Sequence, residues 1–215
     1  MTTTEIIELI EFELKFKEWG ITEQFLEIHA PALFENKIQI GNIVINQSGI
    51  SVYIPIENER FYLVMYIDSN KKEIIRISIE PHITIYFKAT SAELSETELR
   101  NYTNLEITES WNKGDKKASR KSTYNFSGII IEPSKKPNDF ASKLDELISE
   151  LKKDKVGVRK LSKIADGYIQ VDMDSHYGNG MIGGPNLNEV NIRELNNLGL
   201  SIDFYFCVSG SPYKS

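Results

Sequence analysis

The sequence predicts an α+β protein built from two small domains, each an antiparallel sheet with helices packed on one face. Helical apolar spacing near the N-terminus precedes four strand-like runs, over residues 38–46, 50–56, 61–68 and 73–80. The pattern then changes at Glu80-Pro81, where the proline favours an extended or turn connection before it. We therefore expect an acidic helix-plus-meander domain over residues 1–81 and a second α+β domain over residues 82–215.

The first domain is predicted to begin with a helix over residues 4–19. Thr2 and Glu5 have the spacing of a capping box, and Gly20 is expected to end the helix. Thr22 is expected to cap a second, short helix that Pro31 limits. The apolar residues of the first helix form one stripe that is expected to face the core, namely Ile6, Leu9, Phe12, Phe16 and Trp19.

The second domain is predicted to have the element order βαββαβαβ. Ser95 and Glu98 form a second capping box, Asn138 caps the main helix, and Asn188 caps the last one, which Gly199 closes. The tail after Cys207 is expected to be frayed. The predicted strands cover residues 83–89, 104–110, 124–132, 168–174 and 201–207, and the predicted helices cover residues 95–103, 139–151, 157–165 and 188–198.

Charge is unevenly distributed along the chain. The net charge is −6, and residues 1–81 alone carry 13 acidic and 7 basic side chains, so the whole excess lies in the first domain. Clustered negative charge repels nucleic acid and attracts basic partners, although solubility alone would also explain it. The use of Ile, Lys, Asn and Glu suggests a bacterial source. The single Cys207 cannot form an internal disulfide, and no secretory signal or membrane-length apolar run is present, so we expect a cytoplasmic protein.

The glycine-rich stretch 178–184 has the spacing G-x-G-x-x-G after a predicted strand. A dinucleotide site needs its helix to begin at the last glycine, whereas here Pro185 and Asn186 intervene. We expect glycine to be needed because it permits positive φ in a wide connection. Contact with a ligand stays open, with Tyr177 and Gly183 as the binding candidates.

Two other groups of residues are candidate sites. Asp172, Asp174 and His176 lie on one face of a predicted strand. Asp203 would join the two aspartates if the last strand is a neighbour, and three carboxylates would suit Mg²⁺ or Mn²⁺. The alternative is the solvated outer face of a sheet. The loop 111–122 combines Trp111 and Asp115 with the basic residues Lys113 and Arg120, as in a phosphate site, or it is a solvated loop with its tryptophan in the core.

Residues 82–207 resemble an uncharacterised bacterial family, a domain of unknown function. The block 110-SWNKGD-115, the strand 83-ITIYFKA-89 and the stretch 183–206 carry this resemblance. It implies an α+β domain without an established activity, so no catalytic residues follow from it. Residues 1–81 are similar only in outline to small immunity proteins, which neutralise toxins.

These observations favour a binding protein over an enzyme. No nucleophile motif, phosphate-binding loop or paired-cysteine zinc site is present, and no cofactor is expected. The leading hypothesis is a protein-binding module with a basic partner, in its sharpest form a toxin immunity protein. The alternatives are a metal-dependent or ligand-binding domain that uses Asp172, Asp174 and Asp203, and a phosphate or nucleotide binder that uses Lys113, Arg120 and the glycine loop.

Overall fold

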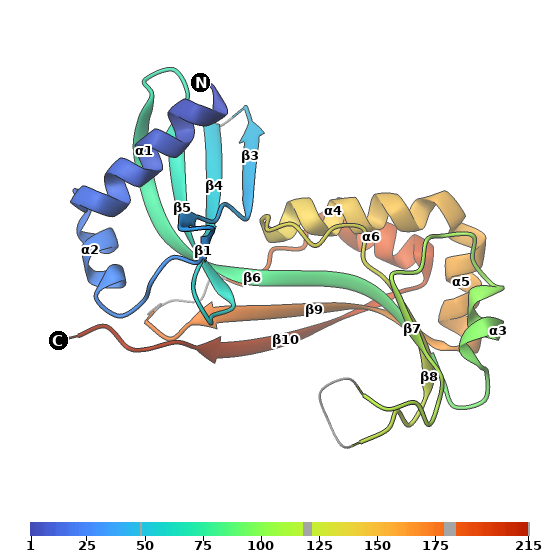
Figure 1. Ribbon diagram of the computed structural model, residues 1–215. Helices are drawn as coiled ribbons and strands as arrows, with labels where there is room; N and C mark the ends of the chain where they lie inside the picture. The colour runs from blue at the N-terminus through green and yellow to red at the C-terminus, as the bar shows by residue number, and fades with distance from the viewer. Residues whose placement is uncertain (48, 118–121, 179–183, 215) are drawn as a thin grey trace.

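The computed structural model describes residues 1–47, 49–117, 122–178 and 184–214 (Figure 1). Its helices are α1 (Thr3–Phe16), α2 (Gly20–Leu26), α3 (Glu96–Arg100), α4 (Phe140–Leu151), the 3-10 turn η1 (Lys152–Asp154), α5 (Lys155–Ile164) and α6 (Glu189–Leu198). Its strands are β1 (Leu33–Phe34), β2 (Lys37–Ile38), β3 (Asn42–Asn46), β4 (Gly49–Pro55), β5 (Phe61–Asp68), β6 (Glu73–Ser91), β7 (Glu109–Trp111), β8 (Ser127–Ile131), β9 (Asp166–His176) and β10 (Ser201–Ser209). The α+β class predicted from the sequence is confirmed.

Within the described residues, eight strands form one sheet in the order β10-β9-β6-β5-β4-β3, and β8 joins it on β6 with β7 beyond. Every neighbouring pair is antiparallel except β9 and β10. The expectation of purely antiparallel sheets is therefore wrong at this edge. The physical reason is that α6 connects the two strands, and a helical crossover returns the chain in the same direction.

Strand β6 runs through the whole molecule, and Figure 1 shows it bending as it passes between the two parts of the sheet. The sequence predicted two strands with a break at Pro81, whereas the strand continues through this residue. Pro81 pairs with Phe61 of β5 and His82 pairs with Asp174 of β9, so the proline lies where β6 exchanges one partner strand for another. Division into two domains stays a prediction, because this strand belongs to both parts.

Within the described residues, two large apolar cores lie along the sheet, beside a small cluster of Tyr53, Tyr62 and Val64. The first lies under α1 and α2, where Ile6, Ile10 and Phe25 pack on the inward residues of β4, β5 and β6. The second lies under α4, α5 and α6, where Phe87 of β6 is surrounded by residues of β8, β9 and the three helices. Figure 1 shows each set of helices over its own part of the sheet.

The predicted capping boxes of Thr2 with Glu5 and Ser95 with Glu98 are both confirmed, as is the cap at Asn188. The caps expected at Thr22 and Asn138 are wrong, because Thr22 lies inside α2 and the neighbouring Asp139 caps α4. Helix α1 ends earlier than expected, at Phe16, because Lys17 adopts a left-handed conformation with φ of 53°. The strand expected over residues 104–110 is reduced to β7. The tail expected to fray instead packs Tyr213 against the first core and His176.

Asp154 holds the start of α5 to the preceding loop. Its carboxylate accepts hydrogen bonds from the Gly157 amide, the Asn104 amide and the Thr103 hydroxyl, each at 2.9 Å. We predict that Asp154→Ala lowers the free energy of unfolding by about 2–4 kcal/mol, since a helix cap and two further bonds to a charged group are lost. Asp139→Ala, which removes a cap bonded only to Ser142, is the control and should cost about 1 kcal/mol in the same urea titration. Equal losses in the two variants would contradict this assignment.

Candidate functional site

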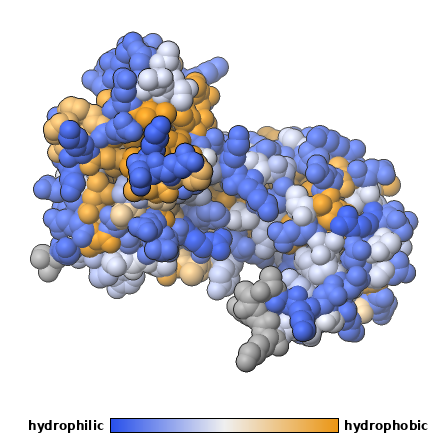
Figure 2. All heavy atoms as spheres, viewed as in Figure 1, coloured by the Kyte–Doolittle hydropathy of each residue, from blue (hydrophilic) through white to orange (hydrophobic). Residues whose placement is uncertain are grey.

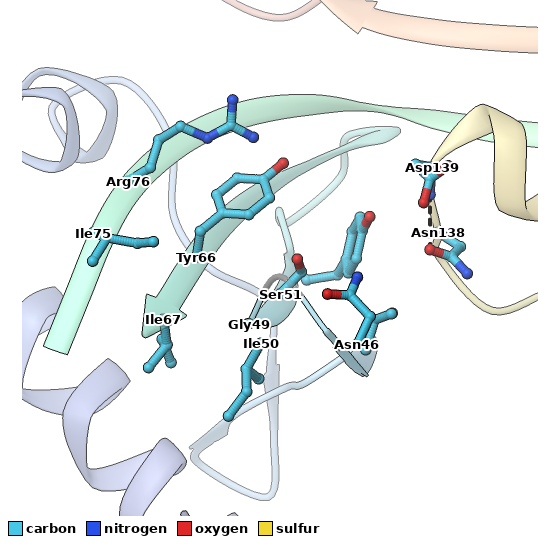
Figure 3. Close-up of a pocket in the computed structure, with 12 residues that line it drawn as sticks. Asn46, Gly49, Ile50, Ser51, Tyr66, Ile67, Ile75, Arg76, Asn138 and Asp139 are labelled. Carbon is cyan, nitrogen blue, oxygen red and sulfur yellow. Dashed lines mark hydrogen bonds between the residues drawn. The ribbon is translucent and has the colours of Figure 1, made fainter. Parts of the chain in front are cut away.

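A groove lined by both apolar and polar residues lies on the face of β3–β6 that points away from α1 and α2 (Figure 3). Its volume is about 560 Å³, and Asn138 and Asp139 at the start of α4 form its far wall. The Arg76 guanidinium lies 3.8 Å from the centre of the Tyr66 ring, and the Tyr66 hydroxyl donates a 2.8 Å hydrogen bond to Glu80. Its described lining therefore offers one cation, Arg76, one carboxylate, Asp139, and several neutral polar groups.

The tyrosines of this face stay neutral at physiological pH. Burial raises the pKa of Tyr53 and of Tyr62 to about 12, and burial followed by the nearby Glu80 carboxylate raises the pKa of Tyr66 further. The rings of Tyr53 and Tyr62 pack edge to face with centres 5.8 Å apart. Neutral phenols of this kind donate and accept hydrogen bonds, so the groove can bind a polar ligand.

The outer face of α1 carries two exposed phenylalanines, which the sequence pattern placed in the core. The buried residues of α1 are Ile6, Ile10 and Glu13, so the stripe expected through Phe12 and Phe16 is wrong. Phe12 is 46% exposed and Phe16 is 56% exposed, and their ring centres lie 4.6 Å apart. The sequence did contain a signal for the buried face, because Ile6 and Ile10 are four residues apart and lie on a different side of the helix from Phe12 and Phe16.

Charged residues flank this phenylalanine pair, and the Lys15 ammonium lies 5.0 Å from the centre of the Phe16 ring. Glu8, Glu11 and Glu18 are all exposed on or beside α1. A shallow pocket of about 180 Å³ adjoins the pair, and Leu9, Phe12 and Trp19 contribute to its lining. In Figure 2 hydrophobic residues gather over the N-terminal part of the molecule, while the visible surface of the other part is mainly hydrophilic. We call Glu8, Glu11, Phe12, Phe16 and Glu18 the α1 surface.

The predicted loop site is partly assembled on the β7–β8 hairpin. The Trp111 indole N–H donates to the Phe126 carbonyl oxygen at 2.9 Å, and its ring stacks on Tyr124. The Asp115 carboxylate accepts from the Asn112 amide, which shapes the turn. Lys113 is exposed, with its amide bonded to the Ser127 hydroxyl. Arg120 and Gly183 lie outside the described residues. Tyr177 is exposed and follows the C-terminal end of β9, which pairs with β6 near His82. It therefore lies apart from Trp111.

The structure does not gather the three aspartates into one ligand set. Asp172 accepts hydrogen bonds from Tyr86 and Gln170, and Asp174 forms an ion pair with Arg60 at 3.0 Å. Asp203 lies beside Gln170 in the register of β9 and β10. Across the described part of the chain, no three His, Cys, Asp or Glu side chains are placed to hold a metal ion. Each aspartate thus has its own neighbours, as expected for the alternative in which these residues lie on the outer face of a sheet.

A histidine pair that the sequence did not indicate joins the two parts of the molecule. His29, which follows α2, places its Nε2 3.0 Å from Nε2 of His176, at the end of β9. The Gly178 amide donates to Nδ1 of His176, so Nε2 of His176 carries the proton and donates to the Ser211 carbonyl oxygen at 3.0 Å. Burial lowers the pKa of both histidines, and the neighbouring His29 lowers that of His176 further. The pair is therefore neutral near pH 7.

The same contact explains one glycine of the predicted loop. A Cβ atom at position 178 would lie 2.5 Å from the Tyr213 ring and 2.7 Å from the His176 ring. Gly178 does not have a positive φ, so close packing rather than the expected backbone conformation requires glycine here. Gly180 and Gly183 lie outside the described residues.

No helix in the described ranges is long and apolar enough to span a membrane. Comparison with curated proteins gives no match, and comparison with solved structures gives none either. Residues 81–208, more than half of the chain, match the family described as a domain of unknown function, DUF4279. This range agrees with the resemblance seen in the sequence and begins inside β6, and the chain belongs to the DUF4279 family.

Proposed function

We propose that this protein binds a basic protein partner through the α1 surface. The observation that carries the proposal is the pair of adjacent, exposed phenylalanines, Phe12 and Phe16, on a helix whose opposite face is anchored in the core. Aromatic residues that lie together on a rigid helix are typical anchors of protein interfaces, because they remove large apolar areas from water at a small entropic cost. The flanking glutamates select the charge of the partner.

Charge around the α1 surface supports a basic partner. Residues 1–30 contain seven glutamates and two lysines, a net charge of −5, which is most of the net charge of −6 of the whole chain. Such a concentration of charge accelerates the encounter with a basic surface and makes the association rate sensitive to salt. In its sharpest form the proposal is an immunity-type role, in which the partner is a toxin that is held inactive.

The first experiment captures the partner from the native organism with the tagged protein at low and high salt, and then measures binding with the purified partner. We expect a basic protein whose affinity falls by about tenfold or more with Phe12→Ala, since removing an interface anchor costs about 2 kcal/mol. Reversal of Glu8, Glu11 and Glu18 to lysine is expected to slow association and remove its salt dependence.

Phe126→Ala is the matched control, because Phe126 is also exposed, to 50%, but lies on the β7–β8 hairpin. It should leave the affinity unchanged. If neither Phe12→Ala nor the charge reversal changes the affinity or association rate of the captured protein, the α1 surface is not the interface. Thermal melting of each variant checks that α1 remains folded, which its exposed positions predict.

A further inference from the structure

A second pocket, of about 360 Å³, lies where β6, β7 and β8 meet, on the opposite side of the molecule from α1. Lys88 and Thr90 of β6 contribute to its lining, together with Trp111 of β7 and with Lys117 and Tyr124 of the hairpin loop. Its size falls at the lower end of the range of pockets for small molecules, which is about 300–1,000 Å³.

The two aromatic rings of this pocket form a fixed platform. The rings of Trp111 and Tyr124 stack with centres 4.9 Å apart and an interplanar angle of 23°. The Trp111 indole is held by its hydrogen bond to the Phe126 carbonyl oxygen and lies against Gly128, where an added Cβ would be 2.2 Å from the ring. The Trp111 ring is therefore held in a fixed position at the wall of the pocket.

Two lysines approach these rings. The Lys88 ammonium lies 5.9 Å from the centre of the Trp111 ring, and the Lys117 ammonium lies 5.3 Å from the centre of the Tyr124 ring. Among the described residues, neither ammonium forms an ion pair or a hydrogen bond with another side chain. The one carboxylate of the pocket lining, Glu109, pairs with Lys135 at 3.8 Å. Two positive charges beside the platform thus lack an anionic partner.

We propose that this pocket binds an aromatic anion, with a planar ring on the Trp111–Tyr124 platform and a phosphate-like group held by Lys88 and Lys117. A nucleoside monophosphate is the simplest molecule with both features, because a base stacks on aromatic side chains and a phosphate accepts hydrogen bonds from ammonium groups. The net charge of −6 opposes a long polyanion, which favours a free mononucleotide over a nucleic-acid strand. This site is separate from the α1 surface and does not depend on the function proposed for it.

The chain contains its own reporter for this site, because Trp19 and Trp111 are its only tryptophans. The variant Trp19→Phe leaves Trp111 as the sole source of indole fluorescence. Titration of this variant with AMP at low salt should quench the emission in a saturable manner. Lys88→Gln and Lys117→Gln should each weaken binding by about tenfold, and Tyr124→Ala by a similar factor.

Lys163→Gln is the charge-matched control, because Lys163 is exposed on α5, away from the pocket, and this change should leave the affinity unaltered. Adenosine and inorganic phosphate, titrated separately, should each bind at least about tenfold more weakly than AMP, since each offers half of the ligand. A short oligoadenylate identifies the source: tighter binding than AMP would indicate a strand, and equal or weaker binding a free nucleotide.

The proposal is overturned if millimolar AMP gives no saturable change in Trp111 emission. It is also overturned if Lys163→Gln weakens binding as much as Lys88→Gln, since the effect would then be one of overall charge. If inorganic phosphate binds as tightly as AMP, the Trp111–Tyr124 platform contributes nothing to the affinity and the proposal fails. Circular dichroism of every variant confirms that the compared proteins are folded.

Discussion

Lowering the pH from about 7.5 to about 5.5 is expected to lower the free energy of unfolding by about 2 kcal/mol. His29, His82 and His176 all have pKa values below the ordinary 6.5 in the folded protein, with burial as the largest cause in each. The unfolded chain therefore binds more protons than the folded one as the pH falls through 6.5. Stability is fully present above this value and decreases below it.

Carboxylates near these histidines partly oppose the effect of burial on their pKa values. The Glu59 carboxylate raises the pKa of His29 and His176 slightly against burial, and Asp174 does the same for His82. Carboxyl groups with lowered pKa, such as Glu5 at about 2, lose their contribution only at more acidic pH. Burial raises the pKa of Glu132, which opposes this change, but three histidines contribute to it, so stability is expected to fall between pH 7.5 and 5.5.

Urea titrations at the two pH values measure this effect, and His176→Gln tests its source. His176 is fully buried, and its protonated form would face His29 across 3.0 Å, so protonation at this position is unfavourable. The variant should be less stable at pH 7.5, because it loses this network, but should depend less on pH than the natural protein. A natural protein whose stability stays constant or rises on acidification would contradict the assignment of the pair as neutral.

Replacing Phe87 by alanine is expected to lower the free energy of unfolding by about 3–5 kcal/mol. The side chain is fully buried in β6, and its neighbours in the register are Ile131 of β8 and Ile169 of β9. The substitution leaves a cavity. The neighbouring strands cannot move together to fill it, because hydrogen bonds to their partner strands hold each of them in place. Phe126→Ala, at an exposed position of the same half, should change stability by less than about 0.5 kcal/mol.

The same measurement tests how the two cores are connected. Leu63→Ala removes a fully buried side chain from the first core and should cost about 2–5 kcal/mol. Because β6 runs through both cores and the histidine pair joins their ends, we expect each variant to shift one common unfolding transition. Two separate transitions, each sensitive to one variant, would instead support the two-domain division predicted from the sequence.

Local patterns in the sequence were sufficient to predict whether most segments are helices or strands. The capping boxes at Thr2 and Ser95, and the left-handed Gly199 after α6, depend on neighbours within a few residues, so they could be recognised without the fold. The family resemblance was also correctly placed, because it rests on the linear order of motifs. Element ends were less predictable, as at β7, because pairing with β8 rather than local preference sets them.

The candidate surfaces could not be read in the same way. Phe12 and Ile10 are both apolar residues of one helix, and only the position of the sheet decides which is buried and which is exposed. Asp172 and Asp203 lie on the same face of the sheet. Asp172 accepts a hydrogen bond from Tyr86, whereas Asp203 lies beside Gln170, and these neighbours come from segments that are distant in the sequence. The histidine pair joins positions 147 residues apart, and neither residue carries a local signal.

The sequence by itself determined the α+β class, the capping boxes at Thr2 and Ser95, the acidic character of the N-terminal part and the family. These properties follow from composition and from interactions between residues close in the chain. Only the tertiary structure decided that β6 is continuous through Pro81, that α1 presents Phe12 and Phe16 to solvent, and that Lys88 reaches the Trp111 ring. Each of these depends on contacts between segments far apart in the sequence, and such contacts exist only once the sheet has assembled.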